Sequence, residues 1–230
     1  MEQPKMNPIL QEIRKRCRMA MNGDASAGMR KYGLAYKLNF GLMISQIKEI
    51  STRYEPNAEL AEILWKEDTR ELKILAGMLY PPHEFSEEKA NVWVVEIPNQ
   101  EIREQLTIHL FQELPFAVDL IRNWALSDNL SVRATAYWLL ARMYLARKLH
   151  GELFLSNLSH VWSDALSSQN VPLRNSAVLA LKHTGRNQKE CIPEILKKIK
   201  MFETENVNLK NEVYEDLSFE FEFFSNKTPD

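Results

Sequence analysis

Trp93 and Glu96 are the two residues whose types and spacing could best serve chemistry in this sequence. They lie three positions apart in EEKANVWVVEIPNQ (87–100), and on a helix that spacing places two side chains on one face. Pro98 must end such a helix soon afterwards, because proline lacks an amide donor and its ring clashes with the preceding turn. An indole and a carboxylate could therefore project together at a helix end, where an indole can stack on a base.

Other familiar catalytic patterns do not occur in the sequence. The five histidines are scattered and form neither an HxxxH nor an HxH pair, so they do not indicate a metal site. Cys17 and Cys191 are too few for a cysteine-based zinc site or a disulfide framework. The serines lack the nucleophile-elbow pattern of hydrolases. Seven glycines leave little room for a phosphate-cradling loop. We expect neither a metal ion nor a cofactor.

Charge is spread unevenly along the chain. The formal net charge of the 230 residues is −2, yet residues 1–53 hold ten basic and four acidic side chains, whereas residues 201–230 hold two basic and eight acidic ones. A positive front end is compatible with a polyanionic partner. The alternative is that these charges are ordinary solvated helix faces.

The apolar spacing predicts helices almost throughout. A first helix around residues 9–17 is followed by a break of small residues (22–33), the only place where glycines cluster. Further helices are expected at 44–54, 58–67, 69–79, 86–97, 99–113, 116–126, 130–147, 152–166, 171–184 and 190–201. No apolar run approaches the roughly 20 residues that span a bilayer, and the first residues lack the apolar core of an export signal. We expect a reduced, cytoplasmic protein that makes no membrane contact.

An internal repeat specifies the fold more closely than the helices alone. Residues 128–142 align with 169–183 at a constant offset of 41, which pairs Asn129 with Asn170 and Arg133 with Arg174. Weaker copies place Arg70 and Arg103 at the same position of the repeat. The pattern resembles the HEAT-type repeat, whose helix pairs stack because one pair cannot bury its own apolar stripe.

We therefore predict an all-α fold, a curved right-handed α-solenoid (α-α superhelix) of HEAT-like helical repeats. A single HEAT-like repeat domain is expected over residues 1–204, followed by an acidic, aromatic-rich C-terminal tail or cap over 205–230. Phe219, Phe221 and Phe223 alternate with acidic residues, so the tail could be an acidic helix or a loose arm. The arginine of such a repeat commonly makes a structural bond across the turn to a carboxylate or carbonyl.

Between Met29 and Gly185 the sequence resembles the DNA alkylation repair family, the AlkD-like DNA glycosylases built of HEAT-like repeats. The segments that carry the resemblance are MRKYGLAYKLNFGLMISQIKEIS (29–51), ELAEILWKEDTRELKILAGML (59–79), EKANVWVVEI (88–97) and SVRATAYWLLARM (131–143). The resemblance implies binding of duplex DNA and, in active members, hydrolysis of the N-glycosidic bond of N3- or N7-alkylated purines. In those members an aspartate framed by tryptophans stabilises the cationic sugar, and an arginine holds a backbone phosphate.

Carried over by position, Trp93 matches the first active-site tryptophan and Arg133 matches the phosphate-holding arginine. The aspartate position holds Ile97, so Glu96 is the remaining candidate carboxylate, and the position of a later tryptophan holds Val178. Two of four functional positions have therefore changed. Whether excision survives these changes, and for which lesion, is left open by the sequence.

Two functions remain as hypotheses. In the first, the protein binds duplex DNA, alkylated or not; excision of alkylated purines, with Trp93 and Glu96 as catalytic residues, is a further hypothesis within this one. Its candidate phosphate contacts are Arg133, Arg30, Lys31, Lys37 and Lys182. In the second, the chain is a non-catalytic HEAT-repeat scaffold that binds proteins or DNA structures. The acidic tail could then cap the last repeat, bind a partner or occupy the protein's own basic groove. We expect a monomer, and a protein partner is not excluded.

Overall fold

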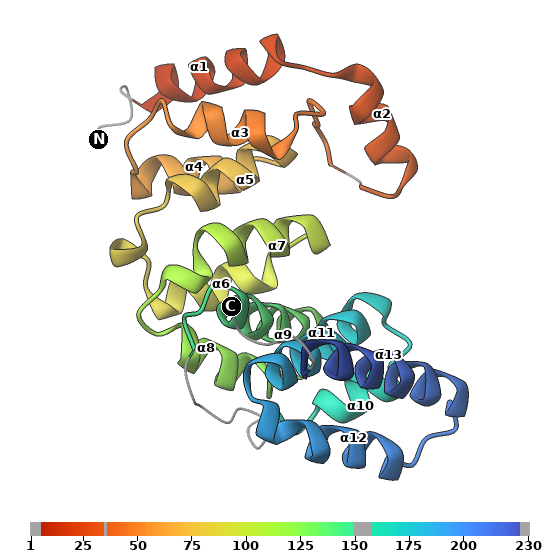
Figure 1. Cartoon of the computed structure of the whole chain (residues 1–230). Helices are drawn as coiled ribbons and strands as arrows, with labels where there is room; N and C mark the ends of the chain where they lie inside the picture. The colour runs from red at the N-terminus through yellow and green to blue at the C-terminus, as the bar shows by residue number, and fades with distance from the viewer. Residues whose placement is uncertain (1–5, 35, 150–157, 226–230) are drawn as a thin grey trace. The chain divides into compact units, whose positions relative to one another are not determined.

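The computed structural model describes residues 6–34, 36–149 and 158–225, and its contacts divide the chain into two compact units. The first unit comprises residues 1–90 and 97–114, and the second comprises 91–96 and 115–230. Nearly all described residues of both units belong to helices or the short turns between them (Figure 1). In the described ranges no strand forms, and Leu38 and Thr69 make one isolated bridge. The predicted all-α class is confirmed.

The helices follow in chain order, unit by unit. Those of the first unit are α1 (Met6–Met19), α2 (Gly23–Lys31), α3 (Ile44–Ser51), α4 (Ala58–Lys66), α5 (Arg70–Leu79), η1 (Pro82–Glu84), α7 (Gln100–His109) and η2 (Phe111–Glu113). Helix α6 (Glu87–Val95) passes from the first unit into the second. The second unit continues with α8 (Ala117–Trp124), α9 (Leu130–Leu145), α10 (Val161–Leu166), α11 (Val171–Asn187), η4 (Lys189–Cys191), α12 (Ile192–Met201) and α13 (Val207–Ser225).

Asparagines begin the helices of the repeat. The side-chain oxygens of Asn99, Asn129 and Asn170 accept backbone N–H groups of the first turns of α7, α9 and α11. These donors have no partner inside the helix, so a polar residue at this position fixes where the helix starts. The repeated asparagines seen in the sequence are therefore helix caps.

The 41-residue offset is a repeat of hydrogen bonds as well as of residue types. Arg133 donates to the carbonyl of Ser127 over 2.8 Å, and Arg174 donates to the carbonyl of Ser168 over 3.2 Å. Two residues further on, Thr135 and Ser176 both donate to the carbonyl four residues earlier. Helices α9 and α11 thus make the same local contacts, as expected of successive repeats.

The expected break at residues 22–33 is wrong, because the structure forms helix α2 there. Three glycines and two alanines gave no apolar stripe and a weak helix propensity. The helix forms because Asn22 caps its N-terminus and because the Ser26 hydroxyl donates to the carbonyl of Asn39, 2.7 Å away. Contacts from a distant part of the chain stabilise this segment, and the local sequence does not reveal them.

Residues 207–225 of the tail form helix α13, which packs against α10, α11 and α12 within the second unit (Figure 1). Its contact face consists of Val213, Leu217 and Phe221, four residues apart and all buried. Of the two conformations considered from the sequence, the structure has the acidic helix. The expected domain boundary after residue 204 stays a prediction. The segment 150–157, which includes the start of the helix expected at 152–166, lies outside the described residues.

Candidate nucleic-acid interface

Four exposed residues in the last turn of α2 and in the segment that follows it form the candidate interface of the first unit. They are Arg30, Lys31, Tyr32 and Lys37, and we call them the α2-end cluster. Arg30 and Lys31 lie in the last turn of α2, and Tyr32 is the C-cap residue with 87% of its surface exposed. Gly33, at φ +88, turns the chain away from the helix. An exposed phenol ring in the same short stretch of chain as three exposed cations suits a sugar-phosphate backbone with accessible bases.

The backbone that carries this cluster is closely packed. Gly41 has φ +73, and a Cβ atom there would lie 2.2 Å from the carbonyl oxygen of Asn22 and 2.7 Å from the amide nitrogen of Ser26. Only glycine lets the 39–42 segment approach the start of α2 this closely. The amide of Asn22 donates to the carbonyl of Phe40 over 2.9 Å. The start of α2 is thereby fixed, which holds the direction of its basic end.

One further contact orients Arg30, and two backbone hydrogen bonds hold the chain next to Lys37. Arg30 donates to the Ser26 hydroxyl over 2.9 Å, so its side chain lies back along α2. Lys37 precedes Leu38, whose amide donates to the carbonyl of Asp68 and whose carbonyl accepts from the amide of Arg70. Within the described residues, no carboxylate lies within ion-pair distance of Arg30, Lys31 or Lys37. Arg30 and Lys31 also lie where cations stabilise a helix by offsetting the dipole at its C-terminus. Lys37 lies outside the helix, so this structural explanation does not apply to it.

Trp93 and Glu96 are separated by burial. Trp93 is 2% exposed and Glu96 is exposed. Helix α6 ends at Val95, so Glu96 lies in the turn that follows, where its amide donates to the carbonyl of Trp93. An indole this deeply buried has no face open to a nucleotide in this structure. The catalytic roles of the two residues stay predictions, and the expected joint projection to solvent is not what the structure has.

Arg133 is bound to a carboxylate rather than exposed to solvent. Its Nε and Nη2 atoms donate to the two oxygens of Asp164 over 2.8 and 2.9 Å, and both residues are buried. The Tyr137 hydroxyl donates to the same carboxylate over 2.8 Å. These contacts raise the pKa of Arg133, chiefly through the hydrogen bonds to Asp164, and burial raises that of Tyr137. A phosphate contact by Arg133 stays a prediction, and this geometry favours the structural role of a repeat arginine.

Arg70 shows the same structural use in the first unit. Its guanidinium binds both oxygens of Glu101, over 2.8 and 2.6 Å, and donates to the carbonyl of Leu42 and to Glu71. Such bidentate pairs fix geometry between elements far apart in sequence. One repeat arginine in each unit, Arg70 in the first and Arg133 in the second, is therefore ion-paired with a carboxylate inside the protein.

Lys182 lies on α11 and is paired with the tail. Its Nζ atom lies 2.6 Å from the Glu220 carboxylate of α13. Of the predicted phosphate contacts, Arg30, Lys31 and Lys37 are exposed within one short stretch of the first unit, whereas Lys182 and Arg133 are in ion pairs of the second unit.

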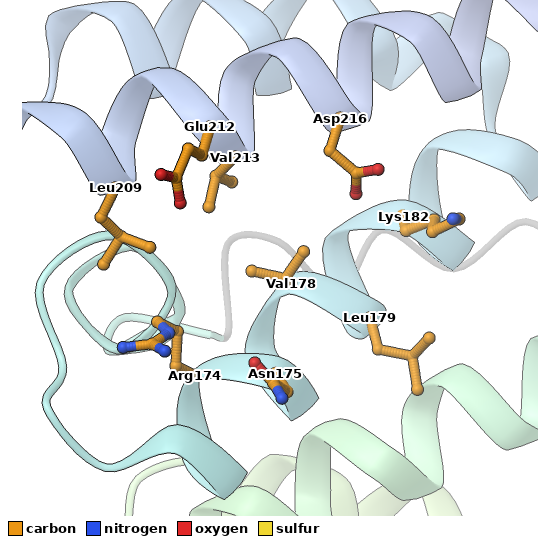
Figure 2. A pocket seen from close by; sticks show the side chains of 9 residues that line it. All are labelled: Arg174, Asn175, Val178, Leu179, Lys182, Leu209, Glu212, Val213 and Asp216. Carbon is orange, nitrogen blue, oxygen red and sulfur yellow. The ribbon is translucent and has the colours of Figure 1, made fainter.

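The two positions that depart from the family pattern hold apolar residues. Ile97 is 6% exposed, and Val178 lines a pocket between α11 and α13 together with Leu179 and Leu209 (Figure 2). Neither side chain can stabilise a cationic sugar. Among the described residues, no group of three or more His, Cys, Asp or Glu side chains is placed to hold a metal ion. No helix in that part of the chain is long and apolar enough to span a membrane.

Tyr32 is the residue of the candidate interface that sequence reasoning missed. A tyrosine is as often buried as exposed, so its type alone does not indicate exposure. The signal that could have identified it is its position between two cations and a glycine, typical of a helix end in solvent.

Comparison with known proteins bears on the family and the fold of the chain. Residues 13–208 match the family model described as DNA alkylation repair enzyme. One solved structure has a TM-score of 0.69 at 16% sequence identity, over 93% of this chain and 94% of that one. It is described as a new family of proteins related to the HEAT-like repeat DNA glycosylases with affinity for branched DNA structures. At this identity the likeness shows the fold, which confirms the predicted HEAT-like repeats. Among curated proteins, none matches the chain. Because the family model covers most of its length, the chain belongs to the DNA alkylation repair enzyme family.

Proposed function

We propose that this protein binds DNA, branched DNA included, through the α2-end cluster, and that it does not excise alkylated bases. The observation that carries the proposal is the exposure of Arg30, Lys31, Tyr32 and Lys37 on a backbone fixed by Gly41 and Ser26. Lysine and arginine side chains without a protein carboxylate can neutralise phosphates and release the counterions condensed on DNA. The family and the related structure with affinity for branched DNA support the same partner.

The choice of branched DNA rests on Tyr32. In a continuous duplex the bases are stacked on one another, so an exposed aromatic ring finds few free base faces. Near a junction the stacking is interrupted, and a ring can stack on an end base for about 1–3 kcal/mol. Tyr32, 87% exposed beside the cations, supports such a contact.

The absence of excision is part of the proposal. Active members need a carboxylate beside exposed aromatic rings. In this chain Trp93 is buried, the aspartate position holds Ile97 and the later tryptophan position holds Val178. Glu96 is exposed, but no aromatic ring at the expected position accompanies it to the surface. These departures favour binding without chemistry.

The remaining features of the proposal are a monomer in the cytoplasm that needs no cofactor. Cys17 and Cys191 are both buried free thiols. Such thiols are the usual form of cysteine in a reducing compartment, which supports this location.

Fluorescence anisotropy with a labelled four-way junction and a linear duplex of the same arms tests the binding. We expect both to bind at low salt and the junction to bind more tightly. The Tyr32→Ala variant should reduce the junction's advantage. Equal affinity for both DNAs would remove the branched-DNA part, and no binding of either at low salt would favour the protein-binding scaffold.

A second assay tests the chemistry. The protein is incubated with methylated DNA, and free 3-methyladenine and 7-methylguanine are measured. We expect no release above a protein-free control. Release that disappears in Glu96→Gln would show that the protein is a glycosylase and that Glu96 is its carboxylate.

A further inference from the structure

Helix α11 carries three cations on one side. Arg174, Lys182 and Arg186 are spaced by eight and four residues, which keeps them within about a third of the helix circumference. All three are half-buried. This side of α11 faces α13, and the two helices belong to the same unit.

Helix α13 docks on α11 through its apolar face. The buried Phe221 ring lies directly over Gly185, where a Cβ atom would be 2.4 Å from the ring. Leu217 is fully buried on the same face. The position of α13 therefore depends on apolar packing and does not require the charged contacts.

The charges along α13 nevertheless match those of α11. The Glu220 carboxylate pairs with both Lys182, at 2.6 Å, and Arg186. The Arg186 guanidinium also lies 3.9 Å from the centre of the Phe224 ring. Figure 2 shows the two turns of α13 that precede Glu220. There Glu212 and Asp216 of α13 face Arg174, Asn175 and Lys182 of α11 across a pocket of about 380 Å³. Carboxylates at 212, 216 and 220 form a row about 6 Å apart along the helix.

We propose that Lys182 and Arg186 form a second phosphate-binding surface, on α11, and that Glu220 of α13 occupies it in the free protein. The proposal rests on the proposed DNA binding and adds a second surface and its intramolecular competitor. Lys182 and Arg186 each keep 23% of their side-chain surface exposed. Long flexible side chains of this kind can turn from Glu220 to a phosphate while α13 stays docked.

The consequence is that Glu220 competes with DNA for Lys182 and Arg186. DNA that reaches only the α2-end cluster gains the contacts of that cluster alone. DNA that also reaches α11 must compete with a carboxylate already in place, so it gains less than two free cations would give. Glu220 therefore lowers the affinity for any DNA that reaches α11.

The test replaces one carboxylate and compares it with a matched control. Glu220→Gln removes the competitor and keeps the side-chain shape. Glu222→Gln removes the same charge from an exposed position of the same helix. At about 0.1 M salt, each cation that gains a phosphate should tighten binding roughly eightfold and steepen the salt slope by about 0.9. We expect Glu220→Gln to bind at least about eightfold more tightly than Glu222→Gln.

A second set of variants identifies the cations. Adding Lys182→Gln and Arg186→Gln to Glu220→Gln should abolish the gain, with helical circular dichroism unchanged. An affinity of Glu220→Gln within about twofold of the control would overturn the inference, as would a gain that survives the loss of both cations. If the wild type binds DNA and loses affinity on mutation of Lys31 and Lys37 while Glu220→Gln equals its control, this inference alone fails. If neither the wild type nor Glu220→Gln binds DNA, the proposed function fails with it.

Discussion

Replacing Arg133 by glutamine should destabilise the second unit strongly and leave DNA affinity nearly unchanged. The substitution removes both hydrogen bonds from Arg133 to Asp164, and the Tyr137 hydroxyl remains as a donor to that carboxylate. Asp164 is 5% exposed, so water cannot replace the lost donors. Removing one member of a buried ion pair costs about 3–5 kcal/mol. A domain of this size is stable by only about 5–15 kcal/mol, so the loss is large.

Urea unfolding followed by tryptophan fluorescence measures the effect. Arg174→Gln is the matched control, because Arg174 lies at the same repeat position and donates a hydrogen bond to the Ser168 carbonyl. Its loss should cost about 1 kcal/mol. The double variant Arg133→Gln/Asp164→Asn should recover part of the stability, because no unpaired charge is left buried. DNA affinity is measured by anisotropy at a temperature where all variants are folded.

The reasoning is refuted by the opposite pattern. If Arg133→Gln keeps the urea midpoint of the wild type and loses DNA affinity, then Arg133 holds a phosphate, as the family resemblance implies. Asp164 would in that case be a partner that DNA binding replaces.

Three further predictions follow from single residues. Gly41→Ala should lower the stability of the protein by at least about 1–2 kcal/mol, because a Cβ atom at φ +73 meets the Asn22 carbonyl. Hydrogen exchange of the α2 amides should become faster, and unchanged exchange would contradict the role of Gly41. Tyr32→Ala should keep the melting temperature, because the ring is 87% exposed, and weaken junction binding by about 1–3 kcal/mol; a lower melting temperature with unchanged binding would assign Tyr32 to structure. Burial, with Arg186 and Lys182 nearby, lowers the pKa of His183 from 6.5 to about 4. Between pH 6.5 and 4 the unfolded chain therefore binds a proton that the folded one does not, and stability falls by up to about 3 kcal/mol as the pH is lowered. His183→Gln should remove this part of the loss in urea titrations at pH 7 and 5. An identical loss of stability in the wild type and the variant would contradict the prediction.

The helices of the repeat could be predicted from the sequence because their signals are local. Asn129 and Asn170 cap helices whose apolar residues recur at helical spacing. Helix α2 could not be predicted, because it depends on Asn39 and Gly41, more than a dozen residues away from its capped start. The helical tail was one of two open alternatives. The alternating phenylalanines drew attention to a period of two, whereas Val213, Leu217 and Phe221 have the helical period of four.

Of the candidate site, the sequence indicated the basic residues in and after α2 but not the ion pairs of the second unit. Arg30, Lys31 and Lys37 are close in sequence, and charge alone identified them. The pairing of Arg133 with Asp164 joins residues 31 apart, and that of Lys182 with Glu220 joins residues 38 apart. A single sequence shows the charges but not which of them meet. For the same reason it could not show that Trp93 is buried while Glu96 is exposed.

The salt dependence of DNA binding tests the central claim most directly. Dissociation constants for the four-way junction are measured between about 50 and 200 mM salt. The proteins compared are the wild type, Lys31→Gln/Lys37→Gln, and the control Lys48→Gln/Lys66→Gln, whose lysines are exposed on α3 and α4 of the same unit. We predict that loss of Lys31 and Lys37 reduces the slope of log K against log salt by about 2, while the control keeps the wild-type slope. A wild-type affinity indifferent to salt, or equal slopes for all three proteins, would contradict binding through the α2-end cluster.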